Sequence, residues 1–436
     1  MAKLLGIWFI IFVGFHQSMS TKSDRYYTKR SVANETFLAF DDGSLENSST
    51  WYGLCGFDEN LDSFCNIYHE ELRLDSSKSP EKYCRIYLDQ GNEKINQSHA
   101  DIHSVRVKSL ADKGAIISWA SLRVEPSHLQ KTLVVSVING SNDTNCQTIT
   151  TKIPLTEHRL VSYDIISLED NFEVIVASSM GFGQDPDLTS FLVDNQGRVL
   201  SNKTLPLELW NLHSSFQVAT VPSGSNQHDY LLLQYYVTSN DEYNSGKATL
   251  TLGESLRNLF KIRSISRGIS QTEHYSGYER SHRIMAYSTG HNKISVCGQQ
   301  FENIRCNQYD PETKEITRVL DEKFEYQVHE FAVYNTLDGG ILLLTTECPD
   351  AACKETGSSG QKYHVAHHPK ASLDHATTNL SFLKYSCNLE ESKSFLKMFE
   401  NKEGEYCFAN ACYYDSLKAH LIDKMQFEIS TVCFKL

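Results

Sequence analysis

The chain has 436 residues, which is too long for one ordinary compact core, so several domains or a repeat architecture are expected. Its formal net charge of −13 disfavours nucleic acid and anionic membrane surfaces as partners. Tyr and Phe are abundant, with 22 and 21 residues, whereas Pro is scarce with 9, a composition typical of an all-β protein.

Residues 1–20 have the pattern of a secretory signal peptide. Lys3 supplies the positive charge, residues 4–15 are apolar, and Ser18 and Ser20 are small residues that precede a cut after Ser20. The apolar run is shorter than the roughly 20 residues that a bilayer requires. We therefore expect a secreted, extracellular protein without a membrane span. Residues 21–34 are polar and are expected to form an N-terminal arm or a short pro-segment.

One pattern recurs along the rest of the chain. A turn rich in Gly, Asn, Asp or Ser precedes a short apolar run, as in Asp338-Gly339-Gly340 before residues 341–344. The runs recur with a mean step of about 59 residues, which indicates a repeat architecture. Their middle positions are Leu54, Ile116, Val174, Leu231, Ile284, Leu342 and Cys407.

Each copy has a similar internal order. An alternating segment precedes the turn, as at residues 160–166, and two more follow the apolar run, as at residues 188–193 and 198–201. Four short antiparallel strands per unit, repeated about seven times, are typical of a β-propeller. The second strand of a blade lies between two neighbouring blades and should be apolar on both faces. We predict an all-β fold in which residues 35–436 form one propeller of seven four-stranded blades, each of about 57–60 residues.

Three alternatives stay open at this point. The first unit, residues 36–97, is rich in loops, so six blades with an N-terminal cap are the main alternative. Two β-sandwiches would also give many short strands, but they require no steady step. By composition, residues 388–399 and 415–425 could each form a short helix.

The 12 cysteines are an even number, as expected for an oxidising compartment. Three close pairs are predicted to be disulfides that staple local hairpins or loops: Cys55–Cys65, Cys297–Cys306 and Cys348–Cys353. The connectivity of the other six is left open, although Cys433 is well placed to join the last unit to the first; the six are Cys84, Cys146, Cys387, Cys407, Cys412 and Cys433.

Seven N-x-S/T sequons accompany the signal peptide and predict several N-glycans on surface loops. The acceptor residues are Asn34, Asn47, Asn96, Asn139, Asn142, Asn202 and Asn379.

A histidine-rich segment is the most conspicuous cluster of possible metal ligands. His364, His367 and His368 lie close together in the sequence and are weak candidates for binding Zn²⁺ or Cu²⁺. On a strand, however, His364 and His367 point to opposite faces. A polar segment between two strands is the preferred interpretation, and no metal or cofactor is expected.

No motif identifies a family or a catalytic residue, so the catalytic residues are unknown and an enzyme is not the favoured interpretation. A rigid ring that carries variable loops is suited to binding. We expect a monomeric extracellular binding protein, such as a venom, salivary or other host-directed product, whose partner is a protein, glycan or small ligand. The alternatives are a secreted hydrolase with its site at the central channel and a structural extracellular component.

Overall fold

The structure is a computed structural model. It describes residues 25–31, 36–46, 49–57, 63–71, 82–88, 98–109, 114–124, 129–139, 148–154, 159–168, 171–179, 187–205, 215–222, 228–237, 243–252, 255–265, 285–300, 303–324, 328–347, 362–369, 392–400, 404–414 and 425–436.

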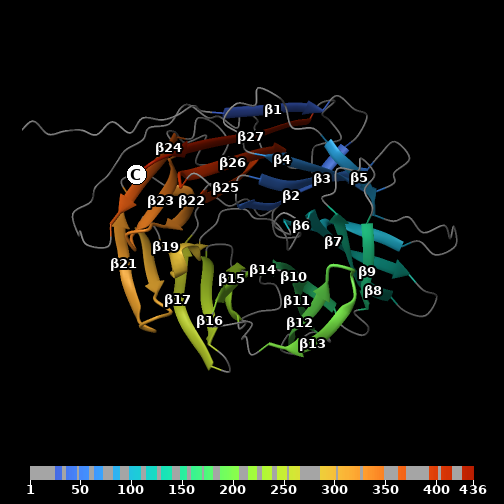
Figure 1. Cartoon of the computed structure of the whole chain (residues 1–436), viewed down its shortest axis with the longest axis horizontal. Helices are drawn as coiled ribbons and strands as arrows, with labels where there is room; N and C mark the ends of the chain where they lie inside the picture. Colours follow the sequence, from blue (N-terminus) through green and yellow to red (C-terminus); the bar gives the residue numbers. More distant parts are fainter. Residues whose placement is uncertain are drawn as a thin grey trace, which may run out of the picture.

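Within these ranges the chain forms seven antiparallel sheets that surround a common centre (Figure 1). Blade 1 contains β2 (Thr36–Glu46), β3 (Ser49–Phe57), β4 (Ser63–Glu71) and β5 (Lys82–Tyr87). Blade 2 contains β6 (Ser98–Ser109), β7 (Gly114–Val124), β8 (Leu129–Asn139) and β9 (Thr148–Pro154). Blade 3 contains β10 (Arg159–Ser167), β11 (Asn171–Ser179), β12 (Asp187–Asp194) and β13 (Val199–Thr204). Blade 4 contains β14 (Ser215–Pro222), β15 (His228–Val237), β16 (Tyr243–Leu252) and β17 (Ser255–Ile265).

The remaining three sheets complete the ring. Blade 5 contains β18 (Met285–Ser288), β19 (Ile294–Gln300), β20 (Asn303–Tyr309) and β21 (Ile316–Lys323). Blade 6 contains β22 (Val328–Asn335), β23 (Ile341–Glu347) and β24 (Lys362–His368). Blade 7 contains β25 (Ser392–Glu400), β26 (Tyr406–Tyr414) and β27 (Met425–Phe434), together with β1 (Arg25–Ser31).

The N-terminal strand β1 closes the ring. It pairs with β27 in antiparallel register, from Arg25 opposite Thr431 to Ser31 opposite Met425. The segment that was expected to be an arm or a pro-segment thus supplies the outermost strand of blade 7. Because β2 also packs against β25 and β26, blade 1 contacts blade 7. The chain is a seven-bladed β-propeller, and the six-bladed alternative with a cap is wrong because the first unit forms a complete four-stranded sheet.

In blades 2, 3, 4 and 6 the second strand is apolar on both faces because it packs against two neighbouring blades, as predicted. In β23, Leu342 and Leu344 pack with Met398 and Phe408 of blade 7. Ile341 and Leu343, on the opposite face, pack in another cluster with residues of blade 5. The same division occurs in β7, β11 and β15, so the buried clusters lie at the seams between blades.

The outermost strands of four blades carry a β-bulge. Each of these strands has one extra residue relative to its partner strand: Tyr83 in β5, Leu200 in β13, Leu259 in β17 and Val319 in β21. A bulge bends and twists an edge strand, which hinders its pairing with a strand of another molecule.

Two predictions about the elements are wrong. The fifth apolar run, marked at Ile284, overlaps β18, which is the innermost strand of blade 5, whereas the second strand is β19. The local pattern misleads because Met285 and Ala286 are buried as deeply as a second strand would be. In addition, residues 388–399 were considered a possible short helix because of their composition. Strand β25 occupies most of them. The described residues contain no helix that is long and apolar enough to cross a membrane.

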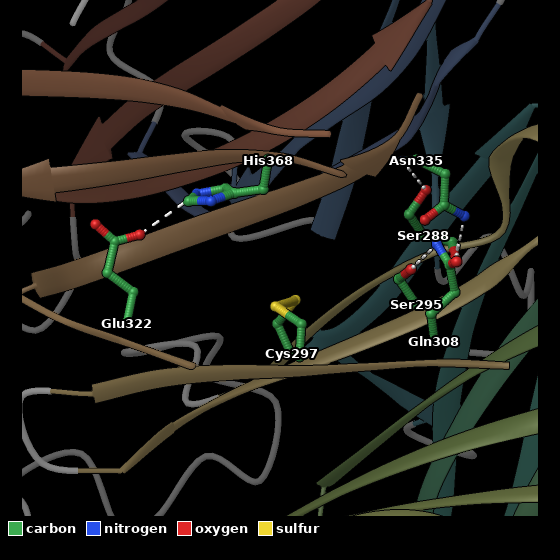
Figure 2. The surroundings of a disulfide bond; sticks show 8 residues. Ser288, Ser295, Cys297, Gln308, Glu322, Asn335 and His368 are labelled. Carbon is green, nitrogen blue, oxygen red and sulfur yellow. Dashed lines mark hydrogen bonds and ion pairs between the residues drawn. A yellow bond between two sulfur atoms is a disulfide. The ribbon is translucent and has the colours of Figure 1, made fainter. Parts of the chain in front are cut away.

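The disulfide between Cys297 and Cys306 joins β19 to β20 inside blade 5 and is one of the three predicted pairs (Figure 2). Cys65 is also disulfide-bonded and lies opposite Cys55 in the register of β3 and β4. Cys407 is disulfide-bonded and lies opposite Cys433 within blade 7. Cys84 is disulfide-bonded as well. The predicted Cys348–Cys353 pair lies outside the described residues.

Candidate functional site

The turn between β22 and β23 is a tightly hydrogen-bonded structure. The N–H of Gly339 donates to the carbonyl of Thr336 at 2.9 Å, and the N–H of Thr336 donates to the carbonyl of Gly340 at 3.0 Å. Gly339 has a φ of 78°, which favours glycine. A side chain at Gly340 would collide with the backbone of His368. The Asp338-Gly339-Gly340 sequence is therefore required by backbone conformation and by close packing.

The corresponding turn of blade 5 is the short 3₁₀ segment Gly290–Asn292 between β18 and β19. His291 and Asn292 both have a φ of 53°, in the left-handed region that non-glycine residues seldom occupy. The fully buried Asn335 holds this segment, because its Nδ2 donates to the carbonyl oxygens of Gly290 at 2.9 Å and of Lys293 at 2.6 Å. Its backbone N–H also donates to Ser288 Oγ at 3.0 Å (Figure 2). Blade 6 thereby fixes an unfavourable backbone conformation in blade 5.

Blade 7 joins these two turns. His291 Nε2 lies 2.8 Å from Glu400 Oε2 at the end of β25, and the two side chains are 18% and 20% exposed. Tyr334 packs edge-on against His291, with ring centroids 6.0 Å apart, and also edge-on against Tyr406, again at 6.0 Å. The N–H of Leu337 donates to the Tyr406 hydroxyl at 3.3 Å. Three consecutive blades are thus interlocked at their first turns.

We call the residues His291, Tyr334, Leu337, Asp338, Glu400 and Tyr406 the turn cluster. Its outermost member is Leu337, which is 76% exposed and is the most exposed large apolar side chain among the described residues. The Asp338 side chain beside it is 46% exposed. The cluster therefore presents an apolar side chain and a carboxylate to solvent.

Hydrogen bonding and charge set the ionisation of this cluster. Burial opposes ionisation of Asp338, but hydrogen bonds from the Thr336 hydroxyl and the Gly340 N–H, together with the nearby His367 imidazole, hold its pKa below the ordinary value. Burial raises the pKa of Tyr406, and the carboxylates of Glu400 and Asp338 raise it further. At neutral pH the surface of the cluster is therefore anionic, whereas the phenol beneath it is neutral.

The three histidines that were weak metal candidates all lie on β24. His367 Nε2 is 3.5 Å from Asp338 Oδ2, which connects it to the turn cluster. His368 Nε2 points toward Glu322 of blade 5 instead, at 3.4 Å from Oε2 (Figure 2). The described part of the chain contains no group of three or more His, Cys, Asp or Glu side chains placed to hold a metal ion. His367 and His368 thus face different carboxylates, one in blade 6 and one in blade 5.

Of the predicted glycosylation sites, Asn202 lies on β13, the outermost strand of blade 3, where it is exposed. Asn139 is the last residue of β8. The other five acceptor residues lie outside the described residues.

The innermost strands of blades 2, 3 and 4 are tied together by the buried Asp164 on β10. Its carboxylate accepts the N–H groups of Ile165 at 2.8 Å and of Val218, on β14, at 3.0 Å. Lys108 Nζ of β6 lies 3.6 Å from it. This ionisable pair near the ring centre joins three blades, which favours a structural role over the acid–base role that a channel hydrolase would require.

Sequence reasoning missed most of the turn cluster. It identified the Asp338-Gly339-Gly340 turn, and for a different reason it singled out His367, which contacts Asp338. His291 and Glu400 carried no signal, because His291 lies in an ordinary polar turn and Glu400 ends a strand of another blade. Their contact depends on how blades 5 and 7 are placed.

No protein-family model matches the chain, and no curated protein matches it. Among solved structures, the chain is similar to the β-propeller domain of the trilobed protease from Pyrococcus furiosus, with 11% identity over 88% of this chain and 93% of that chain and a TM-score of 0.39. It is also similar to an oligogalacturonate lyase from Vibrio parahaemolyticus, with 9% identity over 93% and 96% of the two chains and a TM-score of 0.42. The Dos1 propeller has 8% identity over 96% of both chains and a TM-score of 0.44. Likenesses this distant carry no argument about function.

Proposed function

We propose that the protein is a secreted extracellular binding protein whose partner docks on the turn cluster. The observation that carries the proposal is the position of Leu337, which is 76% exposed on a turn fixed by its own backbone hydrogen bonds. An exposed apolar side chain on a rigid support loses little conformational freedom on binding, so more of its burial energy contributes to affinity.

The chemistry of the cluster indicates the kind of partner. Asp338 is ionised at neutral pH, well above its lowered pKa, and the carboxylates of Glu400 and Asp338 both act on Tyr406 of the cluster. The whole chain has a net charge of −13. A protein with an apolar side chain next to Lys or Arg would complement this surface and would be attracted to it electrostatically.

The proposal includes secretion after removal of residues 1–20, glycosylation of several sequons and a monomeric state. The accessibility of Asn202 on an outer strand supports the glycosylation part. A role as a host-directed secretory product belongs to the same proposal.

The test is capture of partners from extracellular fluid by the immobilised wild-type protein and by Leu337→Asp. The variant places a third acidic side chain at the centre of the proposed contact, so it should weaken binding of the captured partner at least about tenfold. Leu200→Asp is the matched control, since Leu200 is also exposed, at 51%, but lies on the outer strand of blade 3.

Equal capture by wild-type protein and Leu337→Asp would contradict the proposal, as would equal losses in both aspartate variants. Binding to a cationic partner should also weaken at high salt, because the exposed charges are then screened.

A further inference from the structure

A shallow groove of about 250 Å³ lies between the outermost strand of blade 4 and the strands of blade 5. Three cationic side chains line it, namely Lys261 of β17, Arg305 of β20 and Arg318 of β21, and none of its described lining residues is acidic. The lining of the groove is therefore positively charged, whereas the whole chain has a net charge of −13.

Two of the edge-strand bulges shape this groove. In β17 the extra residue is Leu259, and its carbonyl oxygen accepts a hydrogen bond from Asn307 Nδ2 of blade 5 at 2.9 Å. In β21 the extra residue is Val319. In the register of β20 and β21, Asp321 therefore lies opposite Arg305, and Arg318 lies opposite Asn307. In a regular strand, residues three apart point to opposite faces. The bulge places Arg318 and Asp321 on the same face, beside the groove.

The guanidinium groups are held in place and keep donors available. Arg305 donates from Nε to Asp321 Oδ1 at 3.0 Å and from Nη1 to Gln300 Oε1 at 3.1 Å. Arg318 Nη1 donates to Asp321 Oδ2 at 3.4 Å, and its side chain is 60% exposed. Each guanidinium has five N–H donors, and the two share a single carboxylate. One carboxylate balances one of the two positive charges, and these contacts use only a minority of the guanidinium donors.

The rest of the lining is suited to sugar hydroxyls. The side chains of Asn258, Gln300 and Asn307 each contribute an amide, which can both donate and accept. Phe260, which is 8% exposed, supplies an apolar surface. The volume lies just below the range of about 300–1,000 Å³ for small-molecule sites, so it fits a unit of one or two sugar rings.

We infer that this groove binds an acidic saccharide, in which a sulfate or uronate group contacts Arg305 and Arg318 and the hydroxyl groups contact the amides. Forked guanidinium donors match planar or trigonal oxyanions. A sugar hydroxyl group both donates and accepts a hydrogen bond, as the lining amides do, so an acidic saccharide can use the cations and the amides together. An acidic peptide is the competing ligand, and the titration below compares the two directly. The site is distinct from the turn cluster and does not depend on it.

The experiment is a calorimetric titration of the full-length protein with a sulfated, uronate-containing disaccharide. Arg318→Ala removes charge-assisted contacts and should raise the Kd about tenfold or more. The matched control is Arg198→Ala, because Arg198 is a 70% exposed arginine that pairs with Asp194 in a hairpin of blade 3, outside the groove. That control should bind as the wild-type protein does, and both variants should keep its Tm.

Three results would overturn the inference. The first is no saturable binding by the wild-type protein at millimolar disaccharide. The second is a Kd for Arg318→Ala within about twofold of that for Arg198→Ala. The third is that inorganic sulfate, or a peptide of aspartates and glutamates, binds as tightly as the disaccharide, since the groove would then show no preference for a saccharide. None of these outcomes concerns the turn cluster, so the docking proposal would be judged separately.

Discussion

Three aspartates cap hairpin turns with the same hydrogen bond. Asp194, Asp310 and Asp338 each accept the backbone N–H of the residue two positions later, at 2.9, 2.9 and 3.1 Å. The pKa of each is lowered, chiefly by the N–H of Arg198 in the first case and by the Lys293 ammonium in the second. In Asp338, burial works against the hydrogen bonds that lower its pKa. Because the hydrogen bonds within the turn are local, the Asp338-Gly339-Gly340 turn could be predicted from the sequence.

The substitution Asp338→Asn tests whether the charge of Asp338 stabilises the fold, through the pH dependence of unfolding. Because the folded-state pKa of Asp338 is lowered from 3.8, its carboxylate stabilises the fold above that pH, and the contribution is lost as the pH falls through the folded value. We expect the variant to be less stable than the wild-type protein at pH 7 and the difference to shrink between pH 5 and pH 2.5. Thermal unfolding of both proteins across this range measures it. A constant difference at every pH would show that the charge is not what stabilises the turn.

At the scale of the element, the second strand of a blade is the most informative part of the sequence. Its continuous apolar run reflects burial on both faces, as β23 shows by dividing its side chains between blades 5 and 7. The pattern failed in blade 5, where the short inner strand β18 is equally apolar. Both strands are buried, so composition does not distinguish their positions within a sheet.

Leu343→Asp should destabilise the protein by at least about 4 kcal/mol, because a carboxylate would be buried without a partner at a position that is 1% exposed. A large fall in Tm, or failure to recover folded protein, would measure this. Leu337→Asp is the same substitution on the neighbouring turn and should change stability by about 0.5 kcal/mol or less, since the side chain is 76% exposed. If both variants melted alike, the assignment of β23 to the seam would be wrong.

At the scale of the whole molecule, the ring is closed by a strand from the other end of the chain. β1 pairs with β27, while β2 packs against β25 and β26 (Figure 1). Blade 7 therefore depends on residues from both ends of the described chain. Because β1 is short and polar, its sequence resembled a free arm.

A chain that begins at Thr36 lacks β1 and should have a Tm lower by several degrees or more than one that begins at Thr21, and it should aggregate more readily because the edge of β27 is exposed. Hydrogen exchange should be faster in residues 425–431, which pair with β1. Unchanged exchange there would argue against the closure.

The sequence by itself determined the fold class, the recurrence of seven units, the aspartate and glycine turns and the Cys297–Cys306 pair. Each depends on residues that are close in the chain or on burial that repeats with the blades. Only the tertiary structure decided how the ring closes, that His291 meets Glu400, and that two edge strands with bulges line a cationic groove. These features join residues far apart in the chain, and each partner taken alone is an ordinary polar residue in a turn or at an edge.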